Sequence, residues 1–164
     1  MDYTLERMAE AHRQPVIDIY NHFVERDFAA YREKPLPYAA YDRFLSMASG
    51  YPAYVAVAPA DEVAGFGFLH AWHPAECFAR TAEITYFLAP DRTRQGIGSR
   101  LLGALLEGAG PMGIDRILAS ISSRNEASLS FHCRHGFEVC GRFPQVGRKF
   151  GEDFDVVWMA RRLR

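Results

Sequence analysis

The chain has 164 residues, of which 49% are hydrophobic and 13% aromatic, with a formal net charge of −1 at pH 7. This length predicts one domain, residues 1–164, with a full hydrophobic core. The near-neutral charge gives no reason to expect nucleic acid or a charged membrane as a partner.

Cysteine and histidine usage argues against disulfides and metals. The three cysteines form no Cys-x-x-Cys pair, and the six histidines show no metal-ligand spacing. The first residues are too polar for a signal peptide, and no apolar run reaches the length of a transmembrane helix. We therefore expect a cytoplasmic protein without a metal.

Hydrophobic periodicity predicts four helices and six strands. The helices are expected at residues 14–24, 39–48, 98–107 and 125–134, with a break at 108–113. The strands are expected at residues 53–58, 63–72, 82–88, 114–122, 137–141 and 154–159. The segment 25–37 is irregular, which indicates a loop that covers part of the protein rather than a linker. The crossover from strand 82–88 through helix 98–107 to strand 114–122 implies a parallel pair in a mixed sheet, with ligand binding at the carboxyl ends of these strands.

The turn at residues 91–99 is the candidate ligand cradle. Gly96 and Gly98 let the backbone approach a ligand closely, and a helix that begins near Ile97 leaves its first N–H groups without intrahelical partners. These donors and the positive end of the helix dipole favour a diphosphate. Three arginines add positive charge around the turn: Arg92, Arg94 and Arg100.

Two nucleotide-binding patterns do not fit this turn. The dinucleotide fingerprint needs a third glycine where Leu101 stands, and the phosphate loop of nucleotide triphosphatases needs Gly-Lys-Ser/Thr. A surface turn whose glycines only allow tight strand-to-helix packing is the remaining alternative.

Glu83 is the candidate base, because it lies in the otherwise apolar strand 82–88. A carboxylate there is costly unless it is paired or hydrated, and burial would raise its pKa and make it a better base. The alternative is a glutamate at a strand edge that faces solvent.

This order of elements resembles the GNAT superfamily of acetyl-CoA-dependent N-acetyltransferases over nearly the whole chain. Gly96 and Gly98 match its turn pattern, Arg/Gln-x-x-Gly-x-Gly/Ala, with Thr93 at the position of the Arg or Gln. Its later signature appears as Asn125 followed by small residues, and as Gly136-Phe137. The resemblance implies an α/β (α+β) fold: a mixed, mostly antiparallel central sheet flanked by helices, with a splayed parallel strand pair at the cofactor site.

Within the superfamily, the chain resembles the branch of phosphinothricin and methionine sulfoximine acetyltransferases. The segments that carry this resemblance are Ile19-Tyr20-Asn21-His22, Glu83, and residues 144–151 (PQVGRKFG) followed by Asp155. The resemblance implies an enzyme that transfers an acetyl group from acetyl-CoA to the primary amine of a small molecule, such as an amino acid, phosphinothricin or methionine sulfoximine, by direct attack in a ternary complex. It also implies a homodimer.

The resemblance assigns roles to individual residues. Glu83 takes the ammonium proton, and His132 stands where many members place a Tyr that protonates the leaving thiolate; a helix histidine satisfied by packing is the alternative. The expected cofactor contacts are Tyr86, Phe87, Leu88, Arg94, Gln95, Gly96, Ile97, Gly98, Ser99 and Asn125, of which Asn125 is also a candidate helix N-cap. Backbone N–H groups near Phe87 and Leu88 polarise the thioester carbonyl, while the pantetheine arm pairs with the strand. The expected substrate contacts are Tyr31, Phe78, Arg80 and Lys149.

Two other functions stay open. The first is a non-catalytic domain that binds or senses acyl-CoA. The second is acetylation of protein N-termini or lysines, which predicts an open groove, whereas the aromatic loop at residues 28–38 favours a closed pocket.

Overall fold

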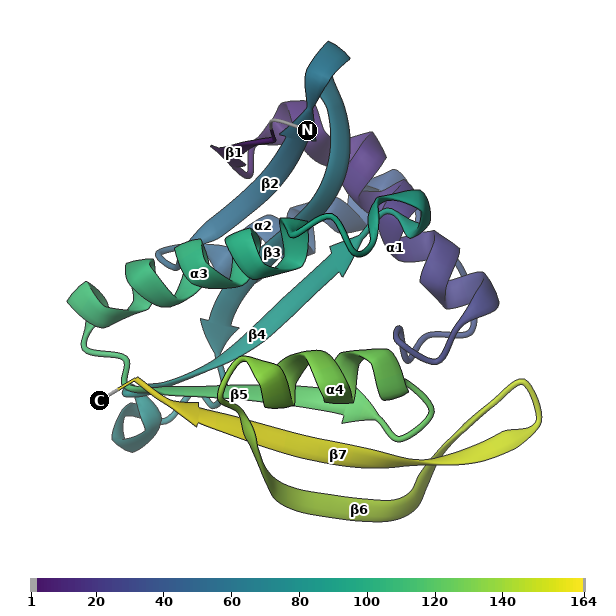
Figure 1. The fold of residues 1–164 in the computed structure, drawn as a ribbon, viewed down its shortest axis with the longest axis vertical. Helices are drawn as coiled ribbons and strands as arrows, with labels where there is room; N and C mark the ends of the chain where they lie inside the picture. Colours follow the sequence, from purple (N-terminus) through teal and green to yellow (C-terminus); the bar gives the residue numbers. More distant parts are fainter. Residues whose placement is uncertain (1–2, 164) are drawn as a thin grey trace.

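The computed structural model describes residues 3–163 as a seven-stranded sheet covered by helices on both faces (Figure 1). In chain order the elements are β1 (Thr4–Arg7), α1 (Arg13–Arg26), α2 (Tyr41–Ala48), β2 (Ala53–Ala58), β3 (Glu62–Ala71), β4 (Thr81–Leu88), α3 (Ile97–Ala109), β5 (Arg116–Ser122), α4 (Glu126–Arg134), β6 (Glu138–Lys149) and β7 (Glu152–Arg162). None of the helices described between residues 3 and 163 has the length and apolar character needed to cross a membrane.

The strand order is β1-β2-β3-β4-β5-β7-β6, and the predicted mixed sheet is confirmed. In the described sheet β4 and β5 are parallel, and the other neighbouring strands are antiparallel. The parallel pair follows from the crossover through α3, because a helix returns the chain to the starting end of the sheet.

A gap opens between β4 and β5, as Figure 1 shows. The two strands pair at three positions, from Thr81 with Arg116 to Glu83 with Leu118. Beyond them β4 stays with β3 as far as Leu88, whereas β5 stays with β7 as far as Ser122. The expected splay of the parallel pair is confirmed, and it exposes one edge of β4 at the carboxyl end.

Alternation along the strands gives the sheet two apolar faces. Phe66 and Phe68 of β3 pack with residues of α1 and α2, among them Ile17 and Tyr41. On the other face, Leu69 of β3 and Ile84 of β4 pack with the leucines of α3, and Phe131 of α4 borders the same cluster. Side chains at odd positions of β4 therefore face α1 and α2, and those at even positions face α3 and α4.

The largest differences from the sequence prediction are a missed strand, a longer C-terminal hairpin and a longer α3. Strand β1 was not predicted, because four mostly exposed residues show no alternation. The C-terminal hairpin is longer than predicted, because β6 is an exposed edge strand whose register shifts between Phe143 and Gly147. Gly108 lies inside α3 rather than in a break; a Cβ there would come within 2.6 Å of Pro52, so this glycine lets the helix pack closely.

Candidate active site

The glycine turn leaves the first amides of α3 open, as predicted. Gly96 is the N-cap residue with a φ of +80°, and no side chain caps the helix. The N–H of Arg100 is the first to reach an intrahelical carbonyl, that of Gly96, at 3.1 Å. The N–H groups of residues 97–99 therefore have no acceptor within the helix, which makes this end suitable for a diphosphate.

Gly98 joins the turn to α4 and β4. A Cβ at Gly98 would lie 3.4 Å from the ring of Phe131 and 3.5 Å from Leu88, so the glycine permits close packing of all three elements. The hydroxyl of Ser99 is hydrogen-bonded to Nε2 of His135 at 3.0 Å, which ties α3 to α4. The predicted cofactor contact of Ser99 is therefore left to its backbone N–H.

Two side chains of the turn, Arg92 and Gln95, are bonded to other residues in the described part of the chain, whereas Arg94 is not. Arg92 is 2.6 Å from the carboxylate of Glu62, so its charge is neutralised inside the protein, contrary to expectation. The Gln95 side chain accepts from the hydroxyl of Tyr3 and donates to the Asp91 carbonyl at 3.3 Å. Arg94 is exposed and makes no ion pair within residues 3–163, so it stays available for a phosphate.

Backbone donors on β4 face the gap at alternate residues. The N–H of Ala89 donates to the carbonyl of Ala64 on β3 at 2.9 Å. Antiparallel alternation therefore directs the N–H of Phe87 to β3 as well, and the N–H groups of Tyr86 and Leu88 to the gap. The expectation that the N–H of Phe87 faces the gap is therefore wrong. Phe87 contributes its ring instead, whose centroid lies 5.3 Å from that of Phe23 in α1.

Glu83 lies where the gap begins. It is the last β4 residue that pairs with β5, its side chain is half-buried on the α1 face, and it makes no hydrogen bond or ion pair within residues 3–163. Burial raises the pKa of Glu83 to about 7. A carboxylate with a pKa near neutrality suits a general base, and its burial argues against a solvent-facing edge residue.

His70, which was not among the predicted site residues, lies directly opposite Glu83 in the β3–β4 register. Directly opposed side chains in an antiparallel pair share a face of the sheet. Burial lowers the pKa of His70, whose Nδ1 is 3.1 Å from the carbonyl of Ala71. The period-2 alternation of β3 was the signal that placed His70 on this face. It is a neutral neighbour of Glu83 near pH 7.

Tyr31 reaches the same side of the gap from the loop after α1. Its hydroxyl is 2.9 Å from Oγ of Ser120 on β5, and its ring stacks on Phe154 at 5.7 Å. Burial raises the pKa of Tyr31, and the nearby charge of Glu83 raises it further. The structure therefore brings together the predicted base and one predicted substrate contact.

His132 and Tyr86 form a pair on the opposite face. Nε2 of His132 is 2.7 Å from the Tyr86 hydroxyl, and Nδ1 is 2.7 Å from the Ser128 carbonyl. Burial lowers the pKa of His132 and raises that of Tyr86. The side chain of Asn125 caps α4 by accepting from the N–H of Ser128 at 3.2 Å, so the capping alternative is confirmed and its cofactor contact stays a prediction.

The other predicted substrate contacts do not meet at the gap. Arg80 makes a two-point ion pair with Asp115 at the amino ends of β4 and β5. Lys149 donates to main-chain carbonyls in and after α1. Phe78 packs on Trp72 in the β3–β4 connection, with ring centroids 5.2 Å apart. Arg80 and Lys149 are thus already occupied by protein partners, contrary to expectation.

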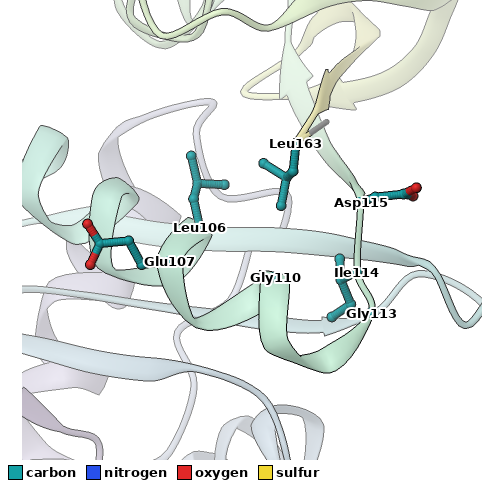
Figure 2. A pocket seen from close by; sticks show the side chains of 7 residues that line it. All are labelled: Leu106, Glu107, Gly110, Gly113, Ile114, Asp115 and Leu163. Carbon is teal, nitrogen blue, oxygen red and sulfur yellow. The ribbon is translucent and has the colours of Figure 1, made fainter.

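A cavity of about 660 Å³ lies at the other end of α3 (Figure 2). Its lining residues are Leu106, Glu107, Gly110, Gly113, Ile114, Asp115 and Leu163. It includes none of the candidate site residues, and in Figure 2 the two carboxylates point away from each other. Among the residues that the structure describes, no group of three or more His, Cys, Asp or Glu is placed to hold a metal ion.

Comparisons with known proteins agree with this geometry. The chain is 37% identical over 150 residues to an L-methionine sulfoximine/L-methionine sulfone acetyltransferase of Pseudomonas aeruginosa, covering 90% of this chain and 87% of that protein. It is 32% identical to a phosphinothricin N-acetyltransferase of Streptomyces coelicolor, covering 92% and 90%.

A solved structure shares the fold closely. The GNAT superfamily phosphinothricin acetyltransferase of Sinorhizobium meliloti, in complex with AcCoA, superposes with a TM-score of 0.93 at 28% identity, covering 99% of this chain and 89% of that one. Residues 16–137 match the Acetyltransferase (GNAT) family. With the open amides of α3, the splayed strand pair and the buried glutamate, these likenesses show that the chain belongs to the GNAT acetyltransferase family.

Proposed function

We propose that the protein transfers the acetyl group of acetyl-CoA to the primary amine of a small molecule, by direct attack in a ternary complex. The observation that carries the proposal is the position of Glu83. Its half-buried carboxylate, with a pKa of about 7, lies at the start of the gap that the open amides of β4 border. The S. meliloti relative with AcCoA supports the choice of cofactor.

The cofactor has two sets of backbone donors in this arrangement. The amides of residues 97–99 and the side chain of Arg94 take the diphosphate. The pantetheine arm follows the exposed edge of β4 like an added strand, with the N–H groups of Tyr86 and Leu88 facing it. The thioester then lies in the gap between Glu83 on one face and Tyr86 on the other.

The transfer needs a neutral amine and a polarised carbonyl. Glu83 accepts a proton from the substrate ammonium, directly or through water, and the freed amine attacks the thioester carbon. Amides facing the gap stabilise the oxyanion that forms. The intermediate then collapses, the C–S bond breaks, and the second proton of the former ammonium passes to the departing thiolate, directly or through water, which gives the neutral amide and the CoA thiol.

The hydrogen bonds of His132 bear on how that thiolate is stabilised. A carbonyl only accepts, so Nδ1 of His132 donates to Ser128. In the neutral imidazole that burial favours, Nε2 then accepts from the Tyr86 hydroxyl. We propose that His132 holds the Tyr86 side chain beside the gap, because Nε2 accepts the single hydroxyl hydrogen of Tyr86, which is then not available to the leaving sulfur. Direct protonation of the thiolate by His132 stays a prediction. A thiol pKa near 8.5 makes such assistance helpful rather than essential.

We propose that the acceptor is an amino acid or an analogue such as methionine sulfoximine or phosphinothricin. The names of the two curated relatives support this class. Tyr31 supplies aromatic surface beside Glu83, whereas Phe78 packs on Trp72 in the β3–β4 connection, away from the gap. Because Arg80 and Lys149 are already bonded within the protein, neither is free to bind the carboxylate of an amino acid.

The decisive experiment is a thiol-release screen of amino acids and their sulfoximine, sulfone and phosphinate analogues, with a lysine-containing peptide alongside. We expect release with a free amino acid or analogue, and loss of release in Glu83→Gln. Acetyl-CoA binding without release from any amine would favour a sensing domain. Release with the peptide alone would favour a protein acetyltransferase. Equal rates before and after EDTA treatment are expected, because the proposed reaction uses no metal.

We also propose a homodimer that forms through β6 and works in the cytoplasm. Edge strand β6 carries the exposed apolar side chains Val139 (60%), Phe143 (52%) and Val146 (60%), and such an edge favours pairing with another chain. Free, exposed thiols at all three cysteines fit a reducing compartment. Light scattering should give twice the monomer mass, and Phe143→Glu with Val146→Glu should give the monomer.

A further inference from the structure

Lys149, the last residue of β6, holds the end of α1 and the loop that follows it. Its side chain is buried, with 1% exposed. Nζ donates to the carbonyls of Phe23 at 3.2 Å, Ala30 at 2.7 Å and Asp27. An ammonium has three hydrogens, so no donor remains for a substrate.

A cation is suited to this position because three carbonyls converge there. Phe23 belongs to the last turn of α1, where the helix dipole is negative. Burial lowers the pKa of Lys149, and the carboxylates of Asp27 and Glu33 oppose that shift. A side chain without donors would remove this partner from the carbonyls of Asp27 and Ala30 and leave the Phe23 carbonyl with only the N–H of Asp27, which is more costly than losing one surface ion pair.

The turn after Lys149 is strained and is supported by the same loop. Lys149 pairs with Glu152, and Phe150 and Gly151 between them have φ of +54° and +75°, as a two-residue type I′ turn requires. Positive φ is unfavourable for a bulky residue. The centroids of the Phe150 and Phe28 rings are 5.5 Å apart. Nζ of Lys149 lies 4.9 Å from the centroid of the Phe150 ring.

A second contact leads from the hairpin to Tyr31. A Cβ at position 147 would fall 2.1 Å from the ring of Phe154, so only a glycine at this position leaves room for that ring. Phe154 in turn stacks on Tyr31, whose hydroxyl meets Ser120 beside the gap. The hairpin residues 147–154 thus contact the loop after α1 in two ways: Lys149 binds its carbonyls, and Phe154 stacks on the ring of Tyr31.

We propose that Lys149 is a positioning residue for the amine acceptor: by holding residues 27–31 against the hairpin tip it keeps Tyr31 beside Glu83. This inference rests on the proposed function for its kinetic consequence, but not for the loop contacts. It also gives residues 144–151 a physical role, because Gly147, Lys149 and the Phe150-Gly151 turn all bear on the same loop.

The test compares Lys149→Met with Arg148→Met in the full chain. Arg148 is the exposed neighbour and pairs with Asp153, so its loss should leave the loop unchanged. For Lys149→Met we expect the KM of the amine to rise about tenfold, while kcat and the KM of acetyl-CoA stay within about twofold. Equal changes in both KM values, or an unchanged amine KM, would overturn the proposal.

Hydrogen exchange of the substrate-free protein separates this proposal from the proposed function. Amides of residues 27–31 should exchange faster in Lys149→Met than in Arg148→Met, and those of α3 should not. Unchanged exchange in the loop would overturn the proposal, whatever the activity. Faster loop exchange in a protein that acetylates no amine would support the positioning contacts and refute the proposed function.

A second variant serves if Lys149→Met does not fold. Phe150→Gly relieves the positive φ and keeps the turn, but removes the ring contact with Phe28. We expect a folded protein with faster exchange at residues 27–31 and an amine KM raised about threefold. Wild-type exchange and KM in this variant would contradict the proposed hold on the loop.

Discussion

The hydroxyl of Tyr86 lies 2.7 Å from Nε2 of His132, and this contact links β4 to α4. Nδ1 of the ring donates to the Ser128 carbonyl, and burial favours the neutral imidazole, in which Nε2 accepts from the Tyr86 hydroxyl. Burial keeps the pKa of His132 below its usual value, whereas Glu83 ionises only near pH 7. A protonated His132 and an ionised Glu83 therefore prevail in different pH ranges.

We predict that kcat rises through about pH 7 and reaches a plateau. Below that pH Glu83 holds its proton and cannot accept another, and above it the base is ionised while His132 is already neutral. The measurement is thiol release at saturating amine and acetyl-CoA from pH 5.5 to 9. A kcat that falls as pH rises above 6.5 would show instead that protonated His132 is required.

Glu83→Gln should lower kcat by about 10²- to 10⁴-fold, the usual contribution of a general base. The amide keeps the shape of the side chain but cannot accept the ammonium proton. Calorimetry should show unchanged acetyl-CoA binding, since the cofactor donors lie on β4 and α3. Glu107→Gln, at the far end of α3, is the matched control and should keep full activity.

Glu83→Gln should also stabilise the fold at alkaline pH. The folded pKa of Glu83 is raised to about 7 from 4.5, so between these values the unfolded chain loses the proton first and stability falls as pH rises. Glu83→Gln removes this penalty, by about 1 to 3 kcal/mol above pH 8 and by nothing below pH 4. Urea unfolding at pH 4 and pH 8.5 measures both. Equal stabilities of variant and wild type at pH 8.5 would show that the carboxylate is well hydrated.

Gly96→Ala should weaken acetyl-CoA binding beyond its effect on stability. Gly96 has a φ of +80° with no atom near an added Cβ, so alanine strains the turn and costs about 1 kcal/mol. Gly113→Ala is matched, since Gly113 has a φ of +77° and equal space, but lies beyond the other end of α3. Both variants should lose similar stability, and the Gly96 variant alone should bind the cofactor about tenfold more weakly. Equal affinities would show that the turn does not hold the diphosphate.

The sequence alone determined six of the seven strands of the central sheet, the parallel pair, the glycine turn and the candidate base. These follow from local chemistry: alternating apolar residues predict a strand, Gly96 permits a left-handed N-cap, and Glu83 is conspicuous in an apolar run. A helix between two strands is enough to predict that they run parallel.

Tertiary structure decided which side chains are free to act. Arg80, Lys149 and Arg92 are cations suited to anionic ligands, yet each is occupied by a partner at least 30 residues away in the chain. Partners so distant leave no periodic trace in the sequence. Likewise, the direction of the Phe87 N–H depends on the register with β3, where a shift by one residue exchanges the two edges of the strand. Local spacing therefore predicted where the chemistry lies, and long-range pairing selected the groups that carry it.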